Sequence, residues 1–242
     1  MTVILPAFNA EKTLRQTYDE IPFEVVNKVI LVDDASDDST VQIANDLNLE
    51  LIEHDINKGY GANQKTCYDA ALDGDADIII MLHPDYQYPP GLITPMVNMI
   101  TSGFYDVILG SRILGGKSIE EGMPLYKYIG NRLLTFMQNF FIGAKLSEYH
   151  TGFRAYKREV LEKIPYHENS DDFLFDGQTL SQIIYSGFSV GELSCPTRYF
   201  EEASSINFSG SVKYGLGCLI TALSFRLSKM GILRKSIFTG LD

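Results

Sequence analysis

Short apolar runs alternate with longer mixed stretches of polar and apolar residues over the first 110 positions of the chain. Five runs, many of them β-branched, predict strands at residues 1–5, 28–32, 49–52, 77–82 and 106–109. Unbroken apolar runs are typical of strands that are covered on both faces, as in a parallel sheet. Mixed stretches of helical length lie between the runs, at residues 11–20, 39–47 and 61–72. The alternation predicts an α/β fold with a mostly parallel central sheet and right-handed crossovers.

Polar side chains gather where the predicted strands end. Asn9 follows the first run, Asp33 and Asp34 the second, Asp85 the fourth and Arg112 the fifth. In open α/β sheets, ligands bind outside the carboxyl ends of the strands. We therefore expect these separate segments to meet at one ligand crevice.

Two later segments combine apolar and basic residues. Apolar positions in residues 126–145 follow helical spacing, and residues 214–225 form a nearly apolar run of 12 residues, shorter than the roughly 20 needed to span a bilayer. Both segments are consistent with helices packed on the core and with interfacial helices that rest on anionic lipid.

Charge is distributed unevenly along the chain. The net charge is −11, and residues 1–111 hold 18 acidic and five basic side chains. An acidic body of this kind argues against a nucleic-acid partner, which requires a dominant basic face. The three cysteines form no close pair and no signal peptide is recognisable, which is typical of a cytoplasmic protein.

A candidate metal-binding segment follows the fourth predicted strand. His83, Asp85 and Gln87 offer nitrogen and oxygen ligands within five residues. Oxygen ligands suit Mg²⁺ or Mn²⁺ better than zinc, and histidine suits Mn²⁺ better than Mg²⁺. The alternative is a proline-rich loop with a packed histidine.

Six motifs occur in order along the chain: VILPAFNAEKTL, VILVDDASDDST, NKG, IIIMLHPDYQYPP, VILGSR and HTGFRAYKREVLEKI. Together they resemble family 2 glycosyltransferases with the GT-A fold, a Rossmann-like nucleotide-sugar transferase fold. Within that family the chain looks most like the dolichyl- or polyprenyl-phosphate sugar synthases. The resemblance covers residues 1–205 as one GT-A domain, and we expect residues 206–242 to form an amphipathic C-terminal helical extension.

The resemblance implies a donor site for a nucleotide-diphosphate sugar, with UDP or GDP as the nucleotide. The residues that match the nucleotide-binding motifs are Pro6, Phe8, Asn9, Asp33, Lys58, Gly59 and Asp85. Asp85, Gln87 and His83 match the metal motif and imply Mg²⁺ or Mn²⁺. His83 replaces the first aspartate of the D-x-D pattern, so the requirement for metal is open.

The resemblance also implies an acceptor side. Arg112 matches a phosphate-contacting arginine that assists departure of the nucleotide, while Arg132, Arg154 and Arg198 match acceptor or phosphate contacts. Asp176 is the first candidate for a catalytic base and Asp172 the second. Glu201 and Glu202 stand where these synthases tend to carry a basic residue. Either Arg198 then holds the acceptor phosphate, or the acceptor is not a polyprenyl phosphate.

The predicted function is inverting sugar transfer to an acceptor, chiefly a polyprenyl phosphate. The alternatives are transfer to a sugar hydroxyl in glycan assembly, which would require the catalytic base, and nucleotide-sugar binding without catalysis. We expect a cytoplasmic protein, peripheral at the inner face of the membrane. An oligomer and a membrane-spanning partner protein are further possibilities.

Overall fold

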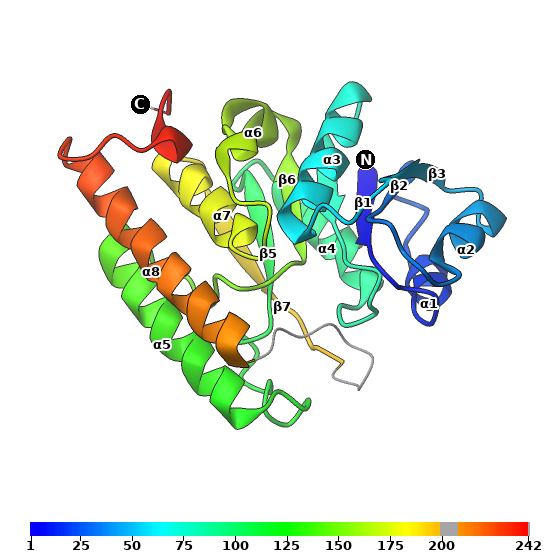
Figure 1. The fold of residues 1–242 in the computed structure, drawn as a ribbon, viewed down its shortest axis with the longest axis horizontal. Helices are drawn as coiled ribbons and strands as arrows, with labels where there is room; N and C mark the ends of the chain where they lie inside the picture. The colour runs from blue at the N-terminus through cyan, green and yellow to red at the C-terminus, as the bar shows by residue number, and fades with distance from the viewer. Residues whose placement is uncertain (199–207, 242) are drawn as a thin grey trace.

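A seven-stranded sheet forms the centre of the computed structural model, which describes residues 1–198 and 208–241 (Figure 1). The strands are β1 (Thr2–Ala7), β2 (Lys28–Asp33), β3 (Glu50–Glu53), β4 (Ile78–Met81), β5 (Val107–Ser111), β6 (Arg154–Lys157) and β7 (Val190–Ser194). Their order in the sheet is β3-β2-β1-β4-β6-β5-β7. Strand β6 is antiparallel to β4 and β5, and the other neighbouring pairs are parallel. The predicted α/β class with a mostly parallel sheet is confirmed.

Helices cover both faces of this sheet. They are α1 (Leu14–Asp19), α2 (Thr40–Asp46), α3 (Tyr60–Asp73), α4 (Ile93–Thr101), α5 (Leu125–Ile142), α6 (Arg158–Lys163), α7 (Phe175–Tyr185) and α8 (Phe208–Lys229). Short 3₁₀ turns lie at Pro90–Leu92, Tyr166–Glu168 and Ser236–Phe238. Helices α1, α2 and α4 bury apolar side chains on one face, and α3, α6, α7 and α8 do so on the other.

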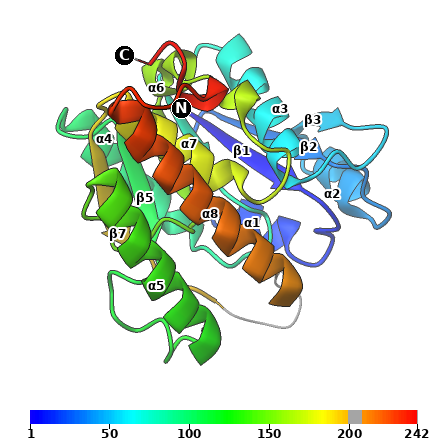
Figure 2. The same ribbon diagram turned by 60° about the vertical axis from the view of Figure 1, so that its left-hand side comes forward.

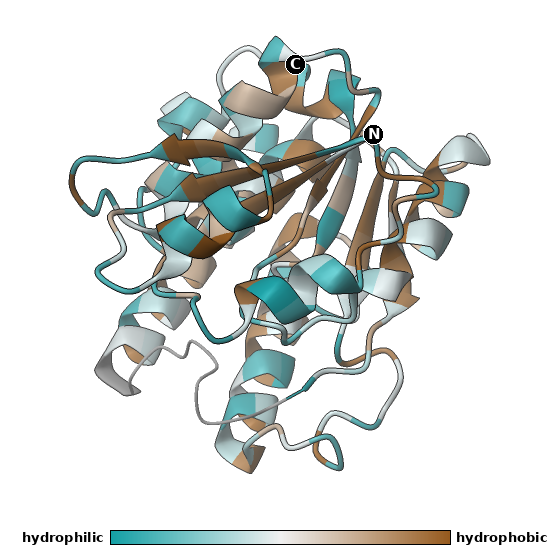
Figure 3. Ribbon diagram, turned by 90° about the vertical axis from the view of Figure 1, so that its right-hand side faces the viewer, coloured by the Kyte–Doolittle hydropathy of each residue, from teal (hydrophilic) through white to brown (hydrophobic). Residues whose placement is uncertain are grey.

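Burial on both faces explains the unbroken apolar runs of the strands. In β1, Val3 and Leu5 join the core under α1 and α4, whereas Ile4 between them joins the core under α3 and α7. The strands are accordingly the most hydrophobic part of the ribbon (Figure 3). For this reason β1 lacks the alternation of apolar and polar side chains that is typical of a strand with one face in water.

Helices α5 and α8 lie side by side and run in the same direction along one edge of the molecule (Figures 1 and 2). Leu134 of α5 packs on Gly215 near the start of α8, and Arg226 near its end donates to the Phe140 carbonyl at 3.2 Å. The other side of α8 reaches the core through Ala222 and Phe225, and Cys218 on this helix is also fully buried. Among the described residues, no helix is both long and apolar enough to cross a bilayer.

The two helical predictions for the later segments are confirmed by α5 and α8. Each helix buries one side, as expected for a helix packed on the core, and leaves apolar side chains exposed on the other. The predicted domain boundary between residues 205 and 206 lies outside the described residues.

Candidate functional site

The direction in which strands are added to the sheet reverses between β1 and β4. From β1 the chain builds outward to β2 and β3, then crosses back to add β4 on the other side of β1. Loops that follow β1 and β4 therefore diverge at their carboxyl ends, where open α/β sheets bind ligands. Phe8 and Asn9 follow β1 and His83 and Asp85 follow β4, so these predicted site residues lie in the two loops at that edge of the sheet.

Backbone strain is concentrated at the same edge. Of four described non-glycine residues in the left-handed region, Asn9 (φ 52°), Ala35 (φ 60°) and Tyr86 (φ 58°) lie in loops that follow β1, β2 and β4. The fourth, Asn48 (φ 53°), precedes β3. Non-glycine residues at positive φ are uncommon, and such strain clusters at binding sites. Pro6 is buried within β1, whereas the Phe8 ring is 53% exposed and available for stacking.

Asp33 ends β2 and is almost fully buried. Its two carboxylate oxygens accept hydrogen bonds from the Ser36 backbone N–H at 2.9 Å and the Ser36 hydroxyl at 2.5 Å. Asn9 joins this turn, because its N–H donates to the Ser36 hydroxyl oxygen and its side-chain oxygen accepts from the Asp37 N–H. The turn thus fixes Asn9 and Asp33 together, and their contact with a nucleotide stays a prediction.

Asp34 organises the glycine-containing loop before α3. Its carboxylate accepts the backbone N–H groups of Lys58 and Gly59, both at 2.9 Å, and lies 2.7 Å from Nδ1 of the buried His54. Gly59 has φ +99°, which a side chain would strain. Lys58 and Gly59, both predicted nucleotide residues, are therefore held by a carboxylate from the neighbouring strand.

The loop after β4 carries the predicted metal ligands. Asp85 accepts the backbone N–H of Gln87 at 3.2 Å across the strained Tyr86, which brings one carboxylate and one amide oxygen into the same turn. Within the described residues no cluster of three or more histidine, cysteine, aspartate or glutamate side chains could hold a metal. This small set of donors fits an ion such as Mg²⁺ or Mn²⁺ whose remaining ligands are water and a diphosphate.

The Asp176 carboxylate lies inside a hydrogen-bond network. One oxygen accepts the Tyr60 hydroxyl at 2.6 Å and the other accepts the Gln64 side-chain N–H at 3.2 Å. The Tyr60 oxygen is also 3.1 Å from Nε2 of His83. Burial, together with the Asp176 charge, raises the pKa of Tyr60 well above its ordinary value, so the hydroxyl stays protonated and donates.

Arg154 does not reach the acceptor side, contrary to the prediction. Its side chain is fully buried, and the guanidinium donates to the carbonyls of Thr151, Tyr149 and Asp176. The guanidinium also lies 4.0 Å from the Asp176 carboxylate. The Arg154 guanidinium therefore stabilises the Asp176 carboxylate, and it is not accessible to a substrate.

Asp172 is exposed and lies three residues before α7. Its carboxylate accepts the Ser170 hydroxyl and the backbone N–H of Leu174, two residues further on, as in an Asx turn. The structure does not bring Asp172 into the Asp176 network. Asp176 is therefore the remaining candidate of the pair.

Arg112 extends from the end of β5 and pairs with Glu148, which is fully buried. The carboxylate also accepts the Arg112 backbone N–H and the Asn131 side chain of α5. Burial alone would raise the pKa of Glu148, but the charge of Arg112 and its hydrogen bonds lower it below the ordinary value. Glu148 is thus an anion that orients Arg112.

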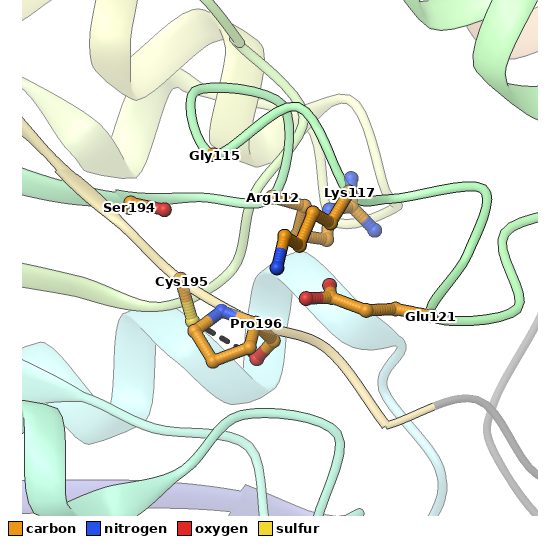
Figure 4. Close-up of a pocket in the computed structure, with 7 residues that line it drawn as sticks. All are labelled: Arg112, Gly115, Lys117, Glu121, Ser194, Cys195 and Pro196. Atoms are coloured by element: carbon orange, nitrogen blue, oxygen red, sulfur yellow. Dashed lines mark hydrogen bonds between the residues drawn. The ribbon is translucent and has the colours of Figure 1, made fainter.

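A hollow of about 260 Å³ adjoins Arg112 at the carboxyl ends of β5 and β7. Lys117 and Glu121 extend toward it from the loop after β5, and Cys195 and Pro196 form the opposite wall (Figure 4). Arg112 and Lys117 give the hollow two cationic side chains. Glu121 adds one carboxylate to the same lining, and Arg112 is already paired with Glu148, so the lining contains charges of both signs.

The segment between α5 and β6 connects Arg112 to both long helices. Arg112 donates to the His150 carbonyl at 2.8 Å, and Nδ1 of His150 lies 2.7 Å from the Tyr214 hydroxyl of α8. Arg132 of α5 is exposed and donates to the Ser147 carbonyl at 3.1 Å. Predicted phosphate contacts Arg112 and Arg132 therefore flank one segment.

Arg198 lies beside the loop after β4, which carries the predicted metal ligands and is called the metal loop below. Its guanidinium pairs with Glu20 at 3.3 Å and stacks 4.0 Å from the centre of the Tyr86 ring, while its backbone N–H donates to the Gln87 carbonyl. These contacts stabilise the loop that carries Asp85, and an acceptor role for Arg198 stays a prediction. Glu201 and Glu202 lie outside the described residues.

Several residues of the site were missed from the sequence. Tyr60 preceded the helix predicted at residues 61–72, Gln64 looked like an ordinary position within it, and Glu148 had no motif to mark it. Their partners are 116, 112 and 36 residues away in the chain, so local spacing held no signal for them. Only Asp34 carried a signal, as the second member of the Asp33-Asp34 pair.

Comparison with curated proteins places these features in a family context. An uncharacterized protein of Methanocaldococcus jannaschii is 30% identical over 84% of this chain and 83% of its own length. A dolichyl-phosphate hexose transferase of Haloferax volcanii is 27% identical over 94% and 96%. A UDP-N-acetylglucosamine–dolichyl-phosphate N-acetylglucosaminyltransferase of Methanococcus voltae is 26% identical over 82% and 86%.

Solved structures confirm the GT-A fold. Glucosyl-3-phosphoglycerate synthase from Mycobacterium tuberculosis in complex with UDP has a TM-score of 0.70 at 17% identity, covering 97% of this chain and 81% of that one. The same enzyme with Mn²⁺ and UDP-glucose has a TM-score of 0.67, with 97% and 80% covered. The model of the family described as "Glycosyl transferase family 2" matches residues 2–165, about two thirds of the sequence. The chain therefore belongs to glycosyl transferase family 2.

Proposed function

We propose that this glycosyltransferase moves a sugar, with inversion, from a nucleotide-diphosphate sugar to the phosphate of a polyprenyl lipid at a membrane surface. Two relatives of similar length are named as transferases that act on dolichyl phosphate. A third, from Mycolicibacterium smegmatis, is named polyprenol monophosphomannose synthase and is 25% identical over 86% of this chain. The observation that carries the proposal is an exposed apolar surface beside Arg112 and Arg132.

This surface, the two-helix apolar face, consists of outward side chains of α5 and α8. Its members are Tyr126, Ile129, Leu133, Phe136 and Phe140 of α5 with Val212, Leu216, Ile220 and Leu223 of α8. Phe136 and Phe140 are each 67% exposed. Soluble monomers rarely expose large contiguous apolar patches, which are typical of interaction sites.

The charges around the two-helix apolar face favour anionic lipid as its partner. Arg132, Lys145, Lys213 and Arg226 are exposed on or next to the same helices. Basic side chains around an apolar helix face attract anionic headgroups, while the apolar side chains enter the boundary with the acyl chains. A phosphate at the end of a membrane-embedded polyprenyl chain would lie at this boundary, near Arg132 and the Arg112–Glu148 pair.

The chemistry of a phosphate acceptor suits the arrangement of Asp176. A phosphate oxygen is already an anion, so it can attack the anomeric carbon without losing a proton to a base. As the new carbon–oxygen bond forms, the bond to the diphosphate breaks on the opposite face and the nucleoside diphosphate leaves with the electron pair. Both Asp176 oxygens already accept hydrogen bonds, which suits a positioning role in this reaction.

The donor half holds the leaving group in the proposed reaction. Phe8, Asn9 and Asp33 would bind the nucleoside, and the loop of Lys58 and Gly59 would lie next to its phosphates. A divalent ion held by Asp85 and Gln87 would neutralise charge that develops on the diphosphate. The sequence assigned Arg112 to the departing nucleotide diphosphate. We propose instead that it faces the acceptor phosphate, because Glu148 directs its guanidinium and Arg112 and Arg132 flank the same segment.

The test is sugar transfer in vesicles that contain anionic lipid and a polyprenyl phosphate. UDP-glucose, UDP-N-acetylglucosamine and GDP-mannose labelled in the sugar are offered in turn, with Mn²⁺ or Mg²⁺ present. We expect labelled lipid from one donor, and no labelled lipid when polyprenol replaces polyprenyl phosphate. Transfer that proceeds equally well to a soluble glycan without vesicles would refute the lipid-phosphate acceptor. Nucleotide binding without any product would leave the non-catalytic alternative.

A further inference from the structure

Tyr60 connects His83, in the loop after β4, with Asp176, which belongs to a separate motif of the family. Its ring lies nearly parallel to that of His83, with 5.4 Å between centroids and 15° between planes, and also contacts Phe173. Its hydroxyl lies between Asp176 and His83 Nε2. A residue of the α3 N-terminus therefore contacts both the metal loop and the candidate catalytic carboxylate.

With Asp176 as a carboxylate, proton counting gives the direction of the hydrogen bonds from His83 through Tyr60 to Asp176. The Tyr60 hydroxyl has one proton, which it donates to Asp176 at 2.6 Å. Its oxygen can then act only as an acceptor toward His83, so the contact at 3.1 Å requires a proton on Nε2. In a neutral imidazole with Nε2 protonated, Nδ1 carries the lone pair.

The rest of the structure leaves that lone pair available. Gly152 packs so closely on the Nε2 edge of the ring that a Cβ atom there would lie 2.4 Å from Nε2. This contact fixes the ring with its Nδ1 edge turned away from Gly152. Within residues 1–198 and 208–241, Nδ1 of the half-buried His83 accepts no hydrogen bond, and it is not among the buried polar atoms without a partner.

We propose that Tyr60 is a positioning residue that fixes His83 with its Nδ1 lone pair directed at the divalent ion of the donor site. Histidines that bind metals usually donate their other N–H to a carboxylate or a carbonyl, which sets the tautomer. Here the Tyr60 hydroxyl oxygen accepts the hydrogen bond from Nε2 of His83, and the hydroxyl in turn donates to the Asp176 carboxylate. The inference rests on the proposed function, because the ion is the one that accompanies the nucleotide-diphosphate donor.

The consequence is a preference of the site for Mn²⁺ over Mg²⁺. Imidazole nitrogen is a good ligand for first-row transition metals, whereas Mg²⁺ prefers oxygen. The site would combine one nitrogen with the oxygens of Asp85 and Gln87. Replacing the family's aspartate by histidine then changes the selectivity of the site without removing the ion.

The tautomer can be measured without metal or nucleotide. Two-dimensional NMR of protein with ¹⁵N-labelled histidine, in mildly alkaline buffer, distinguishes a protonated Nε2 from a protonated Nδ1. We expect His83 as the Nε2–H form in the native chain and a mixture of forms in Tyr60→Phe, which keeps the ring but lacks the hydroxyl. A native His83 with its proton on Nδ1 would overturn the proposal, whatever the activity of the protein.

The metal role is tested by binding, with UDP and GDP as probes. We expect Tyr60→Phe to weaken Mn²⁺ binding about tenfold, as for loss of an outer-shell partner, and to change Mg²⁺ binding less than about threefold. His83→Asn should lose the same Mn²⁺ preference, and adding Tyr60→Phe to it should change little more. Tyr166→Phe is the matched control, because it removes a hydroxyl that donates to Asp69 and leaves His83 untouched.

Pulsed EPR of bound Mn²⁺ shows whether a labelled histidine nitrogen is a ligand. Nitrogen coupling that is present in the native chain and absent in His83→Asn supports the proposal. Mn²⁺ that binds with the nucleotide but shows no nitrogen coupling overturns it and leaves the proposed function intact. Failure of every nucleotide to bind, with either ion or with EDTA, overturns the proposed function and this role of His83 with it.

Discussion

The proposed donor half consists of the loops after β1, β2 and β4, and the proposed acceptor half consists of the Arg112–Glu148 pair with helices α5 and α8. The two halves hold their charged groups in different ways. In the donor half, Asp33 and Asp34 are satisfied mainly by backbone N–H groups and a hydroxyl of nearby loops. In the acceptor half, Glu148 is satisfied by the side chains of Arg112 and Asn131 together with one backbone N–H. The first arrangement fixes loop shape, and the second fixes the direction of a cation.

The two halves also differ in their surfaces. The loops after β1, β2 and β4 carry polar side chains and strained backbone, as expected for a site that receives a polar ligand. Helices α5 and α8 expose the two-helix apolar face, whose side chains are left uncovered by residues 1–198 and 208–241. Under the proposed function, the fold preorganises the donor half, whereas a lipid surface completes the acceptor half.

The largest expected effect comes from breaking the donor half at Asp34. Asp34→Asn weakens the contacts to Lys58, Gly59 and His54, and loss of a partner in a buried charged network costs about 3–5 kcal/mol. Urea unfolding should show this loss, and calorimetry should show loss of nucleotide binding. Glu53→Gln, at the exposed end of β3, is the control. Retained binding of vesicles by the Asp34 variant would show that the halves are independent, and loss of both would refute the comparison.

The strands differ in how well the sequence predicted them. Strands β1 to β5 were predicted because burial on both faces leaves an unbroken apolar signature. Strand β6 was not, because it begins with Arg154, whose charge is satisfied by three carbonyls that only the fold brings near. Strand β7 was missed for a similar reason, since Glu192 interrupts its apolar pattern while accepting the Ser147 N–H.

The donor site was predictable in outline and the acceptor site much less so. Asp33 ends a strand, and Asn9 and Asp85 lie in the loops that follow strands, so their placement at one edge of the sheet followed from sheet topology. The Tyr60–Asp176 contact and the Glu148–Arg112 pair depend on partners far apart in the chain, and the buried state of Arg154 reversed its predicted role. Local patterns locate loops, but they do not show which charges are already paired.

The acceptor half should weaken in acid through His150. Burial lowers the pKa of His150 to about 4, from an ordinary value near 6.5, beside the charges of Glu148, Arg112, Arg154 and Asp176. Between these values the unfolded chain binds a proton that the folded chain does not, so stability falls as the pH falls. The shift corresponds to about 3 kcal/mol, complete near pH 4.

Urea unfolding at about pH 7, 5.5 and 4 checks this prediction. His150→Gln does not titrate there, so its stability should fall less steeply than that of the native chain. Glu148 adds a second loss at lower pH, because its lowered pKa stabilises the fold above its ordinary pKa and that contribution disappears as the carboxylate is protonated. Equal slopes for the native chain and His150→Gln would contradict the assignment to His150.

A smaller effect is expected from placing a charge on the two-helix apolar face. Phe136→Asp removes an aromatic side chain that is 67% exposed, so stability should change by less than about 0.5 kcal/mol. Vesicle binding should weaken by about 2 kcal/mol, roughly thirtyfold, because the phenyl group no longer enters the bilayer boundary.

Sedimentation with vesicles of anionic and of neutral lipid measures this binding. Phe104→Asp is the matched control, since Phe104 is 77% exposed but lies between α4 and β5, outside the two-helix apolar face. Equal weakening by both substitutions would indicate general repulsion from anionic lipid and would remove the evidence for a specific surface.

The smallest effect is expected from substitution of Arg132, which lies between the two-helix apolar face and the Arg112–Glu148 pair. Arg132 is exposed and makes one hydrogen bond, to the Ser147 carbonyl, so Arg132→Ala should leave stability within about 0.5 kcal/mol of the native value. Loss of one phosphate contact should raise KM for the polyprenyl phosphate about tenfold and leave kcat and KM for the nucleotide sugar unchanged. Arg132→Lys should recover only part of the loss, because an ammonium lacks the planar fork that binds phosphate through two donors. A fall in kcat without a change in KM would instead place Arg132 at the transition state, and the acceptor half would then take part in the chemistry as well as in binding.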